Sequence, residues 1–220
     1  MSRTATLSAR ALLLDMDGTL VNSDAVVERY WRLWAADHGL DEESVLKVSH
    51  GRQAHATMAV LLPDRPTAQN VADGRWMLER ESTDLDGVVP VPGAPAFMAS
   101  LAGLPHALVT SADERLARAR MDTAGLPMPE VWVTAERVGV SKPDPEGFLK
   151  GAAELGFAPE DCVVFEDSEV GIAAGRAAGM RVVGVGPRAA AQAPDAHVRD
   201  LDGIRITPHP DGTLQLHLPT

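Results

Sequence analysis

Two aspartates after an apolar run are the residues of this chain best placed to do chemistry. Asp15 and Asp17 lie in the stretch ALLLDMDGTL, where residues 11–14 predict a strand buried on both faces of a parallel sheet. Side chains alternate along a strand, so the two carboxylates are expected to point the same way. At about 4 Å, two such charges repel by roughly 4 kcal/mol at an effective dielectric of about 20. A divalent cation would offset this repulsion, although a lone aspartate here is also typical of a turn or a helix cap.

Polar residues also follow the second strand-like run and precede a later helix. Thr110 and Ser111 come directly after residues 107–109. A hydroxyl and an exposed amide near a helix start suit a phosphate. Lys142 stands just before a predicted helix, where its ammonium could stabilise a phosphate and offset carboxylates. Taken singly, these residues are more typical of helix caps or of a solvated surface than of a phosphate site.

Two further acids, Glu166 and Asp167, end the apolar run at residues 163–165. Asp15, Asp17 and Asp167 at one sheet edge would form an oxygen-rich site with at most one compensating lysine. Hard oxygen ligands with room for water suit Mg²⁺. A carboxylate nucleophile beside Mg²⁺, a second carboxylate and a lysine indicates phosphoryl transfer through an aspartyl-phosphate.

The elements that must position these residues alternate between strands and helices. Strand-like runs recur at residues 11–14, 107–109, 131–133, 163–165 and 182–185. Helices are predicted at residues 113–124, 144–155 and 168–178, each followed by a glycine. Such alternation indicates βαβ units and an α/β fold with a Rossmann-like parallel sheet, whose carboxyl edge carries the polar residues.

A long insertion separates the first strand from the second. Helices are predicted within it at residues 24–38, 42–48, 53–61 and 67–83. The apolar stripe of the first of these helices is expected to belong to a core, and it consists of Val27, Tyr30, Trp31 and Trp34. We therefore predict a core domain of residues 1–21 and 89–220 and a helical cap domain of residues 22–88, placed to act as a lid. Residues 88–95 read as a stiff linker, and residues 204–218 as a hairpin.

Composition narrows the class of protein. The chain has 220 residues, a net charge of −11 and one cysteine, Cys162, which is expected to be buried. The acidic balance predicts no nucleic acid and no membrane partner, and internal disulfides are impossible. We expect a cytoplasmic protein, a monomer or weak homo-oligomer, that binds a small phosphorylated molecule.

Four strings resemble, in order and spacing, the motifs of the haloacid dehalogenase-like (HAD) hydrolase superfamily: DMDGT, LVTSA, VSKPDPEGF and VVFEDSEVGIAAGRAAG. The insertion resembles the α-helical cap of the subfamily that holds small sugar phosphatases and β-phosphoglucomutases. AVVERYWRLWAADHGL, HGRQA and VTAERVGVSKPDPEGFLKGA further resemble bacterial hexitol and hexose phosphatases and yeast glycerol- and deoxyglucose-phosphate phosphatases. The resemblance implies a Mg²⁺-dependent phosphatase that acts on small sugar or polyol phosphates.

The same resemblance implies a role for each acid. Asp15 would attack phosphorus and ligate Mg²⁺. Asp17 would protonate the leaving oxygen, would later deprotonate the hydrolytic water, and would contribute its backbone carbonyl to the metal. Asp167 would be a metal ligand, and Glu166 would support it or replace it as a ligand.

The resemblance also assigns the residues that hold the substrate. Thr110 and the amide of Ser111 would bind phosphate oxygens, and Lys142 would balance the charge between the phosphate and the nucleophile. The cap segment expected to reach into the site is His50, Gly51 and Arg52.

Other activities remain open at this point. β-Phosphoglucomutases carry a histidine where this chain has Val27, which favours hydrolysis over a mutase reaction. Dehalogenases of the superfamily lack an aspartate at the position of Asp17, and phosphonate cleavage would need an activated cap lysine, for which only Lys47 is present. A non-catalytic sugar-phosphate-binding module and a phospho-acceptor of receiver type are further alternatives. A receiver would not carry so long an insertion.

Overall fold

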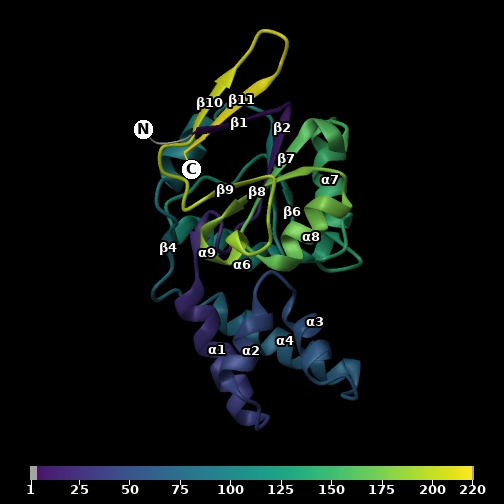
Figure 1. The fold of residues 1–220 in the computed structure, drawn as a ribbon. Helices are drawn as coiled ribbons and strands as arrows, with labels where there is room; N and C mark the ends of the chain where they lie inside the picture. Colours follow the sequence, from purple (N-terminus) through teal and green to yellow (C-terminus); the bar gives the residue numbers. More distant parts are fainter. Residues whose placement is uncertain (1–3, 220) are drawn as a thin grey trace.

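A six-stranded parallel sheet forms the centre of the molecule (Figure 1). The computed structural model describes residues 4–219. Across the sheet the strands are, in order, β6 (Val131–Val133), β5 (His106–Val109), β2 (Ala11–Leu14), β7 (Cys162–Glu166), β8 (Arg181–Val185) and β9 (Ala196–Val198). The predicted α/β fold is confirmed. Because β2 lies between β5 and β7, the residues that follow these three strands meet at one edge.

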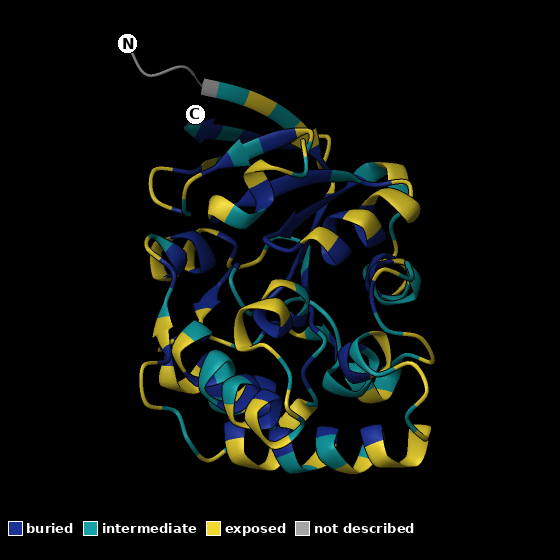
Figure 2. Cartoon of the chain, turned by 60° about the horizontal axis from the view of Figure 1, so that its bottom comes forward, coloured by how far each residue is buried: buried dark blue, intermediate teal, exposed yellow. Residues whose placement is uncertain are grey.

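Helices cover both faces of this sheet. They are α5 (Ala94–Ser100), α6 (Glu114–Thr123), α7 (Glu146–Leu155), α8 (Glu169–Ala177) and α9 (Gly186–Ala190), with short 3₁₀ turns η1 (Ala135–Arg137) and η2 (Pro159–Asp161). Leu12 and Leu14 pack on one face in the cluster that holds Phe97, whereas Leu13 packs on the other with Phe148. The two central strands β2 and β7 are therefore buried throughout, and the centre of the sheet is dark blue in Figure 2.

The predicted core helices are present with small shifts at their ends. Asp113 and Ser168 cap α6 and α8, and each side chain accepts from the backbone amide of the third residue of its helix. Helix α7 begins at Glu146 rather than at residue 144, and the Asp144 carboxylate accepts from the Glu146 amide. Gly156 ends this helix in the left-handed conformation, with φ 81°.

The insertion folds into four helices that lie together beyond the carboxyl edge of the sheet (Figure 1). They are α1 (Asp24–Asp37), α2 (Glu42–Ser49), α3 (Ala54–Leu61) and α4 (Thr67–Glu81). On α1, Tyr30, Trp31 and Trp34 are buried as expected, and the Trp34 indole donates to Asp73 (2.8 Å). Val27 is only partly buried.

The two chain segments that connect this helical unit to the sheet run side by side. Strand β3 (Val21–Asn22) pairs antiparallel with β4 (Val89–Pro90). The segment predicted as a linker at residues 88–95 thus contains a short strand, because its backbone can pair with the outgoing segment. This pairing ties the entry and the exit of the insertion to the same place.

A small antiparallel sheet lies at the opposite end of the core. The predicted hairpin is present as β10 (Arg205–Pro208) and β11 (Leu214–Pro219), and β1 (Thr4–Ala9) pairs with β11. Strands β1 and β9 were missed by the sequence analysis, although β1 alternates polar and apolar residues as a strand does; β9 is very short. Among residues 4–219, none of the helices is long and apolar enough to cross a bilayer.

Candidate active site

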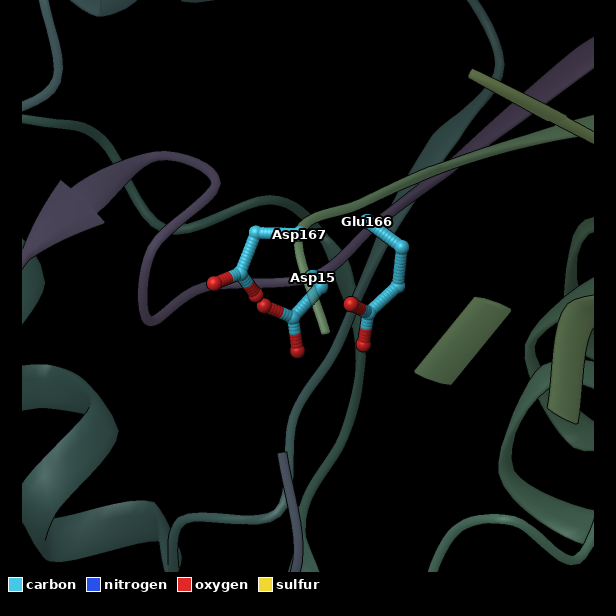
Figure 3. A group of neighbouring side chains, drawn as sticks. All are labelled: Asp15, Glu166 and Asp167. Carbon is cyan, nitrogen blue, oxygen red and sulfur yellow. The ribbon is translucent and has the colours of Figure 1, made fainter. Parts of the chain in front are cut away.

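Three carboxylates converge at the carboxyl edge of the sheet. Asp15 follows β2, and its amide donates to the carbonyl of Phe165 (3.0 Å), which fixes it beside the end of β7. Glu166 and Asp167 stand at that end. One oxygen from each of the three acids lies within 4.8 Å of the others, and Figure 3 shows the carboxylate of Asp15 between the other two. The buried, oxygen-only donor set fits a hard divalent cation.

Lys142 binds two of these acids. Its Nζ donates to Asp15 Oδ1 (2.6 Å) and to Glu166 Oε1 (2.8 Å), and the lysine and both acids are buried. The other oxygen of Glu166 accepts from the amide (2.7 Å) and the hydroxyl (3.0 Å) of Ser168. Both oxygens of Glu166 are therefore engaged by the protein. Asp15 and Asp167 are better placed than Glu166 to ligate a cation.

Burial shifts the protonation of this cluster. Burial, and next the repulsion from Glu166, raise the pKa of Asp15 to about 7, although Lys142 acts in the opposite direction. Burial and the same repulsion raise the pKa of Asp167 well above its ordinary value. Burial alone would lower the pKa of Lys142, but Asp15 and Glu166 raise it. The attraction outweighs burial for the pKa of Lys142, because this lysine faces two acids. It does not do so for Asp15, because Asp15 is repelled by other acids as well as attracted by its lysine.

Metal binding is consequently expected to release protons. A cation binds the ionised carboxylate, and the pKa of Asp15 near 7 keeps much of this group protonated below neutral pH. We expect the affinity for a divalent cation to rise between pH 6 and pH 8, by up to about tenfold per pH unit for each proton released. Titration calorimetry in buffers of different ionisation enthalpy measures this release. An affinity independent of pH, without proton exchange, would contradict it.

The acids are balanced by more than the single lysine expected from the sequence, and in this respect the expectation was wrong. Arg188, just after β8, binds Asp167 Oδ2 through Nη2 (2.7 Å) and Nε (2.9 Å). Its Nη1 also donates to Asp24 Oδ2 (2.9 Å), at the start of α1. Arg188 thus links a metal-ligand candidate of the core to the helical unit.

Thr110 and Ser111 lie at the end of β5, as expected from the sequence. Thr110 is buried, and its Oγ1 accepts from the Ala112 amide (3.1 Å), which holds the turn before α6. The Ser111 hydroxyl donates to the carbonyl of Gly51 (2.9 Å). Both residues line the same cleft as Asp15.

The cap segment proposed from the sequence does reach the sheet edge. The loop between α2 and α3, which carries His50, Gly51 and Arg52, points toward the core in Figure 1 and lines the cleft. The next residue, Gln53, donates its amide to Ser141 Oγ (3.1 Å). Burial, and next the charge of Arg188, lower the pKa of His50. His50 is accordingly favoured in its neutral form.

Gly51 permits this close approach. Its φ is 82°, and a Cβ at this position would lie 2.1 Å from Ser168 Oγ of the core. We expect Gly51→Ala to push the loop off the core and to lower kcat/KM by about tenfold or more. Gly39→Ala is the matched control, because Gly39 also has a positive φ (66°) but no atom within 4 Å of the added Cβ. Equal activity of the two variants in a steady-state assay would refute a role for the contact.

The carboxylate of Asp17 is separate from the three-acid group. Its Oδ1 accepts from Ser23 Oγ (2.7 Å), and its Oδ2 accepts from Arg120 Nη1 (2.8 Å). Nη2 of the same arginine donates to Glu81 Oε2 of α4 (2.6 Å). Burial raises the pKa of Glu81, with Arg120 next and opposing. Both oxygens of Asp17 are thus engaged by the protein, one by a serine and the other by an arginine.

A cleft lies between the sheet edge and the helical unit. Its polar wall includes Asp15 and Asp17, and its lining from α1 and α4 is Asp24, Val27, Trp31, Met77, Leu78 and Glu81. Sequence reasoning missed Glu81 and Arg120. The sequence did hold a signal for both, because each is a charged residue at helical spacing from apolar residues that are buried. Glu81 follows Met77 by four positions, and Arg120 follows Leu116 and Ala117 by four and three.

The fold and the site together define the class of the protein: an α/β protein whose ligand site lies at the carboxyl ends of adjacent parallel strands, under a helical insertion. The chain belongs to the haloacid dehalogenase-like hydrolase family, whose model matches residues 9–179. The family expected from the four motifs is therefore confirmed.

Named relatives are similar over most of the chain. Hexitol phosphatase A of Escherichia coli (strain K12) is 42% identical over 215 residues, covering 94% of this chain and 99% of that protein. Glycerol-1-phosphate phosphohydrolase 1 of Saccharomyces cerevisiae is 35% identical, covering 81% of this chain and 75% of that protein. Fructose-1-phosphate phosphatase YqaB of Escherichia coli (strain K12) is 32% identical, covering 79% of this chain and 95% of that protein.

Solved structures share the fold. The β-phosphoglucomutase of Clostridium difficile has a TM-score of 0.77 at 19% identity, covering 90% of this chain and 93% of that one. A mutant of CbbY from Rhodobacter sphaeroides, solved in complex with xylulose-(1,5)bisphosphate, has a TM-score of 0.73 at 21% identity, covering 89% and 96%.

Proposed function

We propose that this protein is a Mg²⁺-dependent phosphatase that hydrolyses phosphomonoesters of small sugars or polyols. The observation that carries the proposal is Asp15, which is buried against Lys142 and lines the cleft between the sheet edge and the helical unit. Family membership and the phosphatase relatives described above support the same activity.

The first step transfers the phosphoryl group to the protein. Asp15 attacks phosphorus through an oxygen that Lys142 does not occupy, forming the Asp15–phosphorus bond as the bond from phosphorus to the ester oxygen breaks. Asp17 gives its proton to the departing oxygen. Lys142, Thr110 and the Ser111 amide hold the phosphate oxygens.

The second step frees the nucleophile. Asp17, now ionised, takes a proton from a water molecule whose oxygen attacks phosphorus. The bond between phosphorus and Asp15 breaks, and inorganic phosphate leaves. The same acid therefore donates in one step and accepts in the next.

Asp15 and Asp167 would hold the cation, with the backbone carbonyl of Asp17, and Glu166 would keep Lys142 in place. When bound, Mg²⁺ neutralises charge on the phosphate and on the carboxylates. The donor set supports magnesium, because carboxylate and carbonyl oxygens are the ligands that this hard cation prefers.

The helical unit would act as a cap. We propose the division into a core of residues 1–21 and 89–220 and a cap of residues 22–88, with closure of the cap excluding water from the cleft. The pairing of β3 with β4 supports this division, because it places both connections at one hinge. Val27 in the cleft lining, rather than a histidine, supports hydrolysis over a mutase reaction.

A panel of phosphate esters tests the proposal. Hexitol, hexose, pentose and glycerol phosphates are each assayed for phosphate release with Mg²⁺ and with a chelator. We expect metal-dependent turnover of at least one ester, with loss of activity in the chelator. Negligible rates on every ester, or binding without turnover, would overturn the proposal. A cytoplasmic location and a monomeric or weakly associating state remain predictions of the same proposal.

A further inference from the structure

Arg120 is a buried cation shared between two carboxylates. It lies on α6 of the core, and its side chain is 3% exposed. One Nη group donates to Asp17 and the other to Glu81, and the Glu81 side chain is 7% exposed. Arg120 and Glu81 are thus held away from water, whereas the Asp17 side chain is 29% exposed and lines the cleft.

Stability alone does not account for this arrangement. Buried ion pairs are often no more stable than apolar side chains of the same volume, because desolvation offsets their attraction. The Nε–H of Arg120 is also buried without a hydrogen-bond partner among the residues that the structure describes. A buried donor left unpaired is a cost to folding. The guanidinium therefore makes hydrogen bonds through both Nη groups while its Nε–H is left without one in the described part of the chain.

Those contacts fix the direction of the Asp17 carboxylate. Arg120 holds Oδ2, and Ser23, the residue before α1, holds Oδ1. Donors on both oxygens restrict rotation of the carboxylate plane. The arginine reaches Asp17 from α6 of the core.

The second contact of Arg120 crosses from the core to the helical unit. Glu81 is the last residue of α4, and the chain returns to the sheet soon after it. Movement of α4 away from the core would separate Glu81 from Arg120 and leave the guanidinium bound to Asp17 alone. The environment of Asp17 thus depends on where α4 lies.

On the basis of the function proposed above, we infer that Arg120 is a positioning residue that aims the carboxyl of Asp17 at the leaving oxygen. We infer further that the ion pair between Arg120 and Glu81 makes the orientation of the Asp17 carboxyl depend on the contact of α4 with the core.

Leaving groups that differ in their need for a proton test this inference. A sugar alkoxide needs the proton of Asp17, whereas p-nitrophenolate departs without one. For Arg120→Gln, we expect kcat on the best alkyl phosphate of the panel to fall about 100-fold, with KM changed less than about threefold. The first-turnover release of p-nitrophenolate should fall less than about threefold. A structural role would lower both rates alike.

A second set of variants separates positioning from folding. Arg120→Gln leaves Glu81 buried without its cation, so the double variant Arg120→Gln/Glu81→Gln, which buries a neutral pair, is measured beside it. It should show the same difference between the two substrates. Glu81→Gln alone should lower the alkyl phosphate kcat by about tenfold and spare the release of p-nitrophenolate. Arg118→Gln is the control, because Arg118 is an exposed arginine of the same helix paired with Glu114.

Three outcomes would overturn the inference: equal losses on both substrates in the double variant, a change confined to KM, or a Glu81→Gln variant with unchanged kcat. Failure of the proposed function is distinguishable from these, because the wild-type protein would then hydrolyse no alkyl phosphate of the panel.

Discussion

Asp15→Asn is expected to lower kcat by at least about 10⁴-fold while the protein stays folded, because an amide cannot attack phosphorus and removal of a nucleophile costs about this much or more in other hydrolases. Phosphate release measures the loss. Acid quenching followed by intact-mass analysis should detect a phosphorylated wild-type protein and no adduct on the variant. Asp37→Asn, an exposed change at the end of α1, is the control and should keep full activity.

The same variant should alter how stability depends on pH. The pKa of Asp15 in the folded protein, about 7, lies above its ordinary value of 3.8, so the folded state binds this proton more tightly than the unfolded chain does. The resulting stabilisation is fully present below about pH 4 and is lost as the pH rises through 7, a loss on the order of 4 kcal/mol. Asp15→Asn cannot ionise and lacks this dependence.

Metal-free melting curves check this result. At pH 8 and without metal, Asp15→Asn should melt at a higher temperature than the wild-type protein, whereas near pH 4 the two should approach each other. Lys142 keeps Glu166 as a partner in the variant, so its charge remains paired. A variant that is less stable than the wild type at pH 8 would contradict the assignment of a strained, buried carboxylate.

Lys142→Met should damage both the fold and the chemistry. It leaves the buried acids Asp15 and Glu166 without their shared cation, and breaking a buried ion pair in this way costs about 3–5 kcal/mol. It also removes a positive charge from the place where the phosphate binds, which should lower kcat by about 10²- to 10³-fold. Denaturant unfolding at neutral pH and steady-state kinetics measure the two effects.

A double variant separates these effects. Lys142→Met/Glu166→Gln removes one of the two unpaired charges, so it should recover much of the stability but not the activity. Lys150→Met is the control, because Lys150 lies on α7, which begins after Lys142, and its Nζ donates to the carbonyl of Arg137. Recovery of full activity in the double variant would show that Lys142 acts on stability alone.

Local sequence patterns were enough to predict the central strand, the acids that follow the strands and the ends of several helices. The apolar run at Ala11–Leu14 is buried on both faces, and the acids of the strand ends meet because parallel strands finish at one edge. Helix ends were also readable, since the capping side chains of Asp113 and Ser168 and the left-handed Gly156 act within a few residues. These features depend on short stretches of chain and are therefore visible in the sequence.

The sequence by itself determined the α/β class, the helical insertion, the family and the acids of the site. Only the tertiary structure decided which cation faces which acid: Arg120 meets Asp17 from 103 positions away, and Arg188 meets Asp24 from 164 positions away. Such pairings arise from how helices pack against the sheet, and no local pattern encodes them. For the same reason, the partner of β1 became known only when β11, from the far end of the chain, was seen beside it.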